Sequence, residues 1–175
     1  MSVRFVALLL ALAPLTTACS RWTEPLRPGD TSWQRLAAAR TPLADTAFRV
    51  RWDANTIPPV MPRGSETDVR ISFTNLGDGV WPDTLSADPG TRAGAFAVRL
   101  AYDWSPADAG TSPPPAHRAD LPRPVRPGET MTLLVHVVAP PVPGNYRLEL
   151  ALLQELVAWF HVKGAPDLRV PVTVS

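Results

Sequence analysis

Gln154 and Glu155 precede the aromatic pair Trp159 and Phe160, and these residues are the best equipped for ligand chemistry. An exposed ring stacks on the C–H face of a sugar, while an amide and a carboxylate bind its hydroxyl groups. Adjacent strand residues point to opposite sides, so one ring enters the core and the other faces outward or lies under a loop. With Trp104 they form the candidate ligand-binding set. The alternative is that both rings are packed and Glu155 caps a turn; it is favoured because large aromatics are mostly buried.

No constellation typical of an enzyme accompanies this set. The histidines His117, His136 and His161 are isolated and the chain has one cysteine, so no metal-ligand spacing is present. The sequence contains no nucleophile elbow, no phosphate-binding loop and no carboxylate pair at acid–base spacing. It therefore predicts a non-catalytic protein without metal or cofactor. A hydrolase with an unrecognised site is the least favoured alternative.

Length and charge narrow the class of protein further. The chain has 175 residues and a formal net charge of +1, which suits one domain. Residues 1–18 contain one basic residue, Arg4, so the rest of the chain has equal numbers of basic and acidic residues. Such neutrality argues against a nucleic-acid partner, which attracts a positive surface. The 21 prolines punctuate the chain into short segments, a composition that favours strands and rigid loops over a helical bundle.

The amino terminus has the pattern of a bacterial export signal. Arg4 precedes an apolar run over residues 5–13, which is too short to span a bilayer and suits a secretory signal peptide over residues 1–18. The single cysteine, Cys19, follows directly. Residues 15–19, Leu-Thr-Thr-Ala-Cys, resemble a lipobox, with Thr16 at the usual leucine position, which implies lipid attachment to Cys19. The alternative is ordinary cleavage after Ala18, which predicts a soluble periplasmic or secreted protein.

The residue after the cysteine bears on location. Ser20 stands where an aspartate would retain a lipoprotein in the inner membrane, so the lipobox resemblance implies an outer-membrane protein facing the periplasm or the cell surface. Residues 19–45 show no two-residue alternation and are expected to form a tether. Within the tether, residues 32–40 favour a short helix that Pro42 would end.

Residues 46–175 alternate between apolar and polar positions, which is the pattern of half-buried strands. Turn signals such as Pro-Gly at 127–128 and 143–144 separate these segments. The pattern predicts an all-β, immunoglobulin-like antiparallel sandwich of about seven strands. The expected strands cover residues 48–52, 69–74, 96–104, 131–138, 146–153, 157–162 and 168–174.

Two local motifs strengthen this fold assignment. Asn75, Gly77 and Trp81 lie in the turn 75–82, Asn-Leu-Gly-Asp-Gly-Val-Trp-Pro. Gly144 and Tyr146 belong to Pro-Gly-Asn-Tyr, which places a tyrosine where a strand follows a tight turn. Such a tyrosine suits a tyrosine corner, whose hydroxyl binds nearby backbone.

These motifs, with residues 98–104, 118–130, 139–148 and 154–160, resemble the immunoglobulin-like domains appended to bacterial glycosyltransferases and other polysaccharide-related proteins. More distantly, the chain is similar to the four-tryptophan domain, of which Trp81 carries over in its Asn-x-Gly setting. The resemblance covers residues 48–175 and implies an accessory module that binds glycans or proteins. The sequence departs from that family pattern in lacking an attached transferase domain.

Two further features have competing interpretations. Outward-facing arginines on several strands suit an anionic ligand, but they more often pair across strands, for instance Arg99 with Glu149. Residues 105–117 are expected to form an exposed loop, where binding is often located. The sequence therefore predicts a membrane-anchored binding module for a glycan or an envelope protein, with a structural subunit that docks another envelope protein as the alternative.

Overall fold

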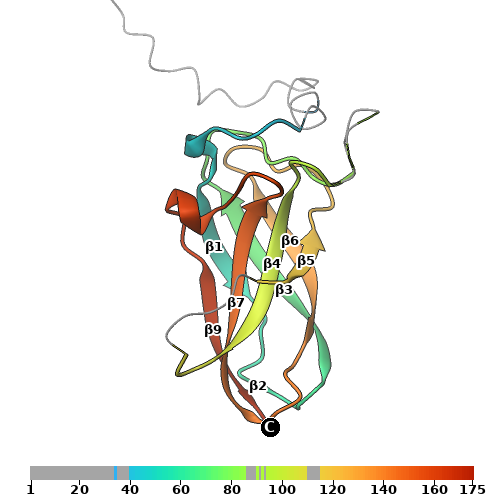
Figure 1. The fold of residues 1–175 in the computed structure, drawn as a ribbon, viewed down its shortest axis with the longest axis vertical. Coiled ribbons are helices and arrows are strands. Elements are labelled where there is room, and N and C mark those ends of the chain that lie inside the picture. Colours follow the sequence, from blue (N-terminus) through green and yellow to red (C-terminus); the bar gives the residue numbers. More distant parts are fainter. Residues whose placement is uncertain (1–33, 35–39, 86–89, 91, 93, 110–114) are drawn as a thin grey trace, which may run out of the picture.

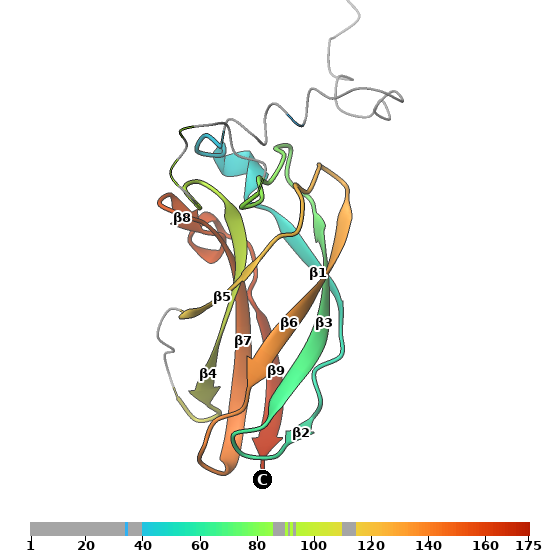
Figure 2. The ribbon, with the colours of Figure 1, turned by 90° about the vertical axis from the view of Figure 1, so that its right-hand side faces the viewer.

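Two sheets pack face to face in the computed structural model, which describes residues 34, 40–85, 90, 92, 94–109 and 115–175 (Figures 1 and 2). The smaller sheet has the order β1 (Val50–Asn55), β3 (Glu66–Asn75), β6 (Thr130–Val138). The larger has the order β2 (Val60–Met61), β9 (Leu168–Val174), β7 (Gly144–Gln154), β4 (Val98–Pro106), β5 (His117–Asp120), and β8 (Ala158–Trp159) pairs with β7. All pairs are antiparallel except β2–β9. The predicted immunoglobulin-like β-sandwich is confirmed.

The core forms between the sheets because alternate side chains of each strand point inward. In β6 every second residue is buried, and buried and exposed residues alternate in the same way through the middle of β3. Between β4 and β7, Leu100 lies opposite Leu152 and Tyr102 opposite Leu150, so the inward-facing residues of the two strands lie side by side. Burying a side chain of this size contributes about 1.5–3 kcal/mol. Apolar packing between the inward faces of the two sheets therefore holds them together.

Most predicted strand ends shift by one to three residues in the structure, and two of these differences have a clear local cause. The strand expected from residue 96 begins at Val98, because Phe96 has a left-handed backbone (φ 56°) that interrupts extended structure. The strand expected over 157–162 is wrong beyond Ala158–Trp159, since the chain then turns into the 3₁₀ helix η2 (His161–Lys163). The short strands β2 and β5 were not predicted, because neither shows enough alternation to be detected.

The turn after β3 joins the strands to the segment that precedes the sandwich. Trp81 is fully buried and its indole N–H donates to the carbonyl of Ala47, in the 3₁₀ helix η1 (Asp45–Ala47), at 2.9 Å. The Asn75 side chain donates to the carbonyls of Gly79 and Val125 and accepts from the Gly77 N–H. These bonds fix the turn, so this motif is structural, as the sequence indicated.

The tyrosine corner is also present. The Tyr146 hydroxyl donates to the carbonyl of Val142 at 3.0 Å, across the turn that precedes β7. A Cβ at Gly144 would lie 3.3 Å from the Tyr146 ring, so the glycine leaves room for that ring. The predicted role of these two residues is confirmed.

Several predictions fall outside the described residues. They concern the signal peptide over 1–18, lipidation at Cys19, most of the tether with its short helix, and residues 110–114 of the expected loop. In the part of the chain that the structure describes, no helix has the length and apolar character needed to cross a membrane.

Candidate functional site

Trp159 lies on the outer face of the larger sheet. In β8 it pairs with Leu153 of β7. Leu150 and Leu152 point into the core, and because successive strand residues alternate, Leu153 points to the opposite face. Trp159 lies directly across from Leu153 and so shares that outer face. Its ring is half-buried. The next residue, Phe160, is fully buried. The expected division of the pair, with one ring inward and one outward, is therefore confirmed.

Two cationic or polar side chains lie against the Trp159 ring. The Arg118 guanidinium carbon is 4.9 Å from the ring centroid, which is cation–π geometry. The His161 ring stacks on Trp159 with centroids 5.7 Å apart and an angle of 14° between planes. His161 in turn lies 3.3 Å from the Asp167 carboxylate. The indole is thus held in one orientation on the sheet surface.

An ion-pair network continues from Arg118 across the sheet. Glu155 lies 3.5 Å from Arg118 and 3.4 Å from Arg99, and Arg99 contacts Asp120 at 2.6 Å. Two positive and two negative charges therefore balance, and all four side chains keep between about a quarter and a half of their surface exposed. Such pairs contribute little to stability in solvent, and they leave carboxylate oxygens and guanidinium N–H groups available to a polar ligand.

We call this patch the Trp159 surface. It consists of an aromatic ring, two arginines, two carboxylates and a histidine: Trp159, Arg118, Arg99, Glu155, Asp120 and His161. A flat ring beside hydrogen-bonding groups of both polarities is suited to a neutral polyhydroxylated ligand. The network lacks the net charge that would select a strongly anionic or cationic ligand.

Gln154 does not take part in this surface, although the sequence pointed to it. It is buried, and its side-chain oxygen accepts from the Leu43 N–H at 2.9 Å. Its nitrogen donates to the carbonyls of Thr41 and Phe96 at 2.9 and 2.8 Å. Both hydrogens of the amide and its oxygen are thus engaged, so Gln154 fastens the segment before the sandwich to the domain.

Phe160 and Trp104 are also apart from the Trp159 surface. Phe160 packs edge-on against Phe48 and Trp81 with centroids about 5 Å away, in the core. Trp104 lies opposite Leu148, in the middle of β7, and its indole N–H donates to the carbonyl of Val138. Of the five predicted ligand-binding residues, the structure brings together Glu155 and Trp159.

The expected ion pair between Arg99 and Glu149 is wrong. The register of β4 and β7 puts Arg99 opposite Leu153, and Glu149 opposite Asp103. Glu149 is buried, accepts a hydrogen bond from the Ser105 hydroxyl at 2.7 Å and lies 3.7 Å from Arg169. Two outward arginines do pair across strands, Arg99 with Asp120 and Arg169 with Glu149, and these partners follow from the strand register.

Sequence reasoning missed Arg118 and Asp120 as site residues. Both belong to β5, a four-residue edge strand that has no apolar alternation. The sequence placed Arg118 and Asp120 only within a family motif. Their approach to Glu155 and Arg99 follows from the antiparallel pairing of β5 with β4, which places Arg99 opposite Asp120.

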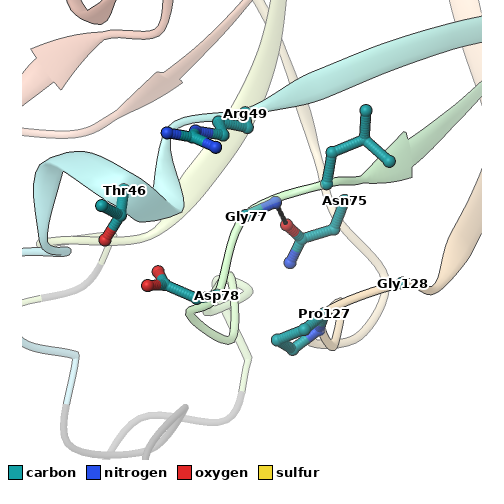
Figure 3. Close-up of a pocket in the computed structure, with 8 residues that line it drawn as sticks. Thr46, Arg49, Asn75, Gly77, Asp78, Pro127 and Gly128 are labelled. Atoms are coloured by element: carbon teal, nitrogen blue, oxygen red, sulfur yellow. Dashed lines mark hydrogen bonds between the residues drawn. The ribbon is translucent and has the colours of Figure 1, made fainter. Parts of the chain in front are cut away.

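A separate pocket of about 410 Å³ opens beside the turn after β3. Figure 3 shows Thr46, Arg49 and Asp78 around it. Asn75 also lines it, but its amide is already engaged within the turn. Among the described residues, the three exposed polar groups share no hydrogen bond or ion pair, so the pocket has no preorganised site. Nor do the described residues contain three or more histidine, cysteine, aspartate or glutamate side chains grouped as metal ligands.

Comparison with known proteins gives distant structural likenesses. No protein-family model and no curated protein matches the chain. Among solved structures, a β-glucosidase from Listeria innocua in complex with glucose is 11% identical, with a TM-score of 0.39 over 73% of this chain and 16% of that chain. The protein AvmM, which catalyses macrocyclization in alchivemycin A biosynthesis, is 15% identical, with a TM-score of 0.40 over 73% of this chain and 89% of that chain. At these TM-scores neither likeness bears on function.

Proposed function

We propose that this chain is an exported, membrane-tethered binding module that contacts a glycan of the cell envelope without catalysing a reaction. The observation that carries the proposal is the Trp159 surface, where an oriented, partly exposed indole lies beside guanidinium, carboxylate and imidazole groups. An aromatic ring among hydrogen-bonding groups suits a sugar, whose C–H groups contact the part of the indole that Arg118 and His161 leave exposed while its hydroxyls bind the polar side chains around it.

The rest of the molecule supports a scaffold role. Binding residues are often carried on loops and edges of a rigid framework, and here a short edge strand and the segment after β7 carry them. The export signal and the cysteine at position 19 supply a route to the envelope and a point of attachment. A tethered domain of this kind needs no pocket, because a polymer is contacted along an open surface.

Glycan binding is tested with the full chain carrying Cys19→Ser, so that no lipid contributes. It is screened on an array of envelope polysaccharides, and hits are measured by calorimetry. Trp159→Ala removes the ring and is expected to weaken binding by roughly tenfold or more, while Trp159→Phe retains an aromatic face and keeps most of the affinity.

Trp104→Phe is the matched control, because that indole is half-buried against the core, apart from the Trp159 surface, and its replacement should not affect binding. Absence of binding to every envelope glycan, or equal binding by Trp159→Ala, would reject the proposal and favour docking to an envelope protein. The anchor is tested separately by metabolic labelling with radioactive palmitate, which should label the wild-type chain and not Cys19→Ser.

A further inference from the structure

Strand β6 borders the smaller sheet and is paired on one side only. Its nine residues are in register with β3 from Thr130 opposite Thr74 to Val138 opposite Glu66. In the described part of the chain no strand pairs with its other side, and β6 lies toward the viewer in Figure 2. Alternate residues of such a strand direct their backbone N–H and C=O groups away from the sheet.

The other sheet edges carry features that prevent further pairing. Strand β1 is interrupted by a bulge between Trp52 and Ala54. Strand β5 has four residues, of which Arg118 and Asp120 are charged. Strand β2 has two residues. Short length, charges and bulges are the means by which proteins keep strand edges from associating.

Strand β6 has none of these protections over residues 130–136, and at its end the carbonyl of Val138 is engaged by the Trp104 indole N–H. It is regular over nine residues and contains no proline, glycine, lysine, arginine or acidic residue. Its solvent-facing row is Thr130, Thr132, Leu134, His136 and Val138. The central member, Leu134, is 58% exposed, and Val138 is 39% exposed. An edge of this kind is a template for another strand.

We infer that the β6 edge binds the β6 edge of a second copy of this chain, antiparallel, about a twofold axis through Leu134. In that register Leu134 lies opposite its equivalent, and each Thr132 lies opposite the other copy's His136. The two strands then face each other along their length, with free backbone groups on both sides from Thr132 to His136, while the Val138 carbonyl at each end keeps its bond from Trp104. The two smaller sheets join into one sheet of six strands.

The charge pattern favours a second copy over an unrelated strand. His136 lies 3.3 Å from Glu66 and 3.0 Å from Asp68, on the β3 strand of its own chain. Across the twofold axis it faces a threonine, so no like charges meet, and the exposed leucines cover each other. The row therefore places Thr130 opposite Val138 and Thr132 opposite His136, on either side of an apolar centre, and two copies meet without a charge conflict.

This inference is independent of glycan binding. The Trp159 surface lies on the larger sheet, whereas β6 belongs to the smaller one. The test is sedimentation velocity of the full chain with Cys19→Ser, at about 1–100 µM, the range in which small interfaces associate. The chain is expected to be dimeric at the upper end. A chain that stays monomeric throughout overturns the inference.

Replacing Leu134, the residue on the twofold axis, with a charged residue gives the variants that test the interface most directly. Leu134→Lys and Leu134→Glu each place like charges opposite one another, so each alone should dissociate at least about tenfold more readily than the parent chain. Mixing the two should restore a dimer, because lysine then faces glutamate. The matched control is Val60→Lys, at a residue 55% exposed on a different strand, which should leave the dimer intact. Dimerisation by Leu134→Lys alone, or failure of the mixture to associate, overturns the inference.

A cysteine substitution keeps the test valid if a charge impairs folding. Directly opposite residues have Cβ atoms about 4.5–5.5 Å apart, close to the range that a disulfide spans. Leu134→Cys in the Cys19→Ser chain should therefore oxidise to a covalent dimer, while Val60→Cys should not. Equal cross-linking of the two variants overturns the inference.

Discussion

Among the glycines that the structure describes, Gly77 has the least room for a side chain. A Cβ there would lie 2.3 Å from the carbonyl oxygen of Ala47, the same oxygen that accepts the Trp81 indole N–H. We expect Gly77→Ala to lower the free energy of unfolding by roughly 2–3 kcal/mol, because backbone must move to relieve the contact. Urea denaturation followed by tryptophan fluorescence measures the loss.

Gly128 is the matched control for this variant. It has a left-handed φ of 76°, but a Cβ added there would meet no atom within 4 Å. Gly128→Ala should therefore cost only the backbone strain, about 1 kcal/mol. Equal losses for the two variants would show that conformational strain, and not the approach to Ala47, explains the glycine at position 77.

Gln154 is the second residue whose side chain reaches a distant part of the chain. Gln154→Glu preserves its shape but directs a buried carboxylate at the carbonyl oxygens of Thr41 and Phe96. We expect a loss of about 3 kcal/mol at pH 7. Part should return at acid pH, because a carboxyl raised in pKa by burial and by these oxygens becomes protonated as the pH falls.

The measurement is the urea midpoint of Gln154→Glu at pH 7 and pH 4, relative to the parent chain. Asn145→Asp is the control, because the side chain of this exposed residue contacts the Thr173 hydroxyl and should change stability by less than about 0.5 kcal/mol. A Gln154→Glu chain as stable as the parent would mean that residues 41–43 are not fastened as the structure has them.

Strand β6 has a titrating group on its exposed row. The hydrogen bond with Asp68, and the nearby charge of Glu66, raise the pKa of His136 above its ordinary 6.5 against the opposing effect of desolvation. A raised pKa in the folded state stabilises the fold below the unfolded value, and this stabilisation is lost as the pH rises through the folded value. Stability should therefore fall between about pH 6 and pH 8.

Chemical denaturation at both pH values measures this slope. Removing either member of the pair, with His136→Gln or Asp68→Asn, should flatten it, while Thr132→Ser on the same row should leave it unchanged. A slope that persists in both of the first two variants would assign the pH dependence to a different group.

The long strands could be predicted because the alternation of apolar and polar residues is enough to identify them. Ile71, Leu133 and Leu150 are buried whatever the register, since alternation fixes the inward face of each strand before any pairing is known. The Trp159 surface could be predicted only in part. Arg118 reaches Trp159 through the pairing of a short charged strand, and Gln154 is occupied by Thr41, 113 positions away. Contacts of that kind leave no periodic pattern in the sequence.

Under the proposed attachment at Cys19, the point where the chain enters the sandwich sets the distance between the Trp159 surface and the membrane. The segment at residues 40–44, where the chain enters the sandwich, is bound by Gln154 at the end of β7. Trp159, in β8, pairs with the same end of β7, and the C-terminus lies at the opposite end of the molecule (Figure 1). With a lipid on Cys19, the roughly 20 residues up to Arg40 would span at most about 70 Å. The Trp159 surface would therefore stay within reach of polymers close to the membrane.

Pairing through β6 would give one molecule two Trp159 surfaces, so both proposals together predict avidity. A long polymer that engages both surfaces binds the second at a high effective concentration, which raises apparent affinity by roughly a hundredfold or more without a new contact. Leu134→Lys should therefore lose about this factor for immobilised polysaccharide, measured by surface plasmon resonance. Its affinity for a short oligosaccharide, which fills one surface, should stay within about twofold of the parent. If the variant bound the polymer as tightly as the parent while monomeric, the two surfaces would act separately and the dimer would serve another purpose.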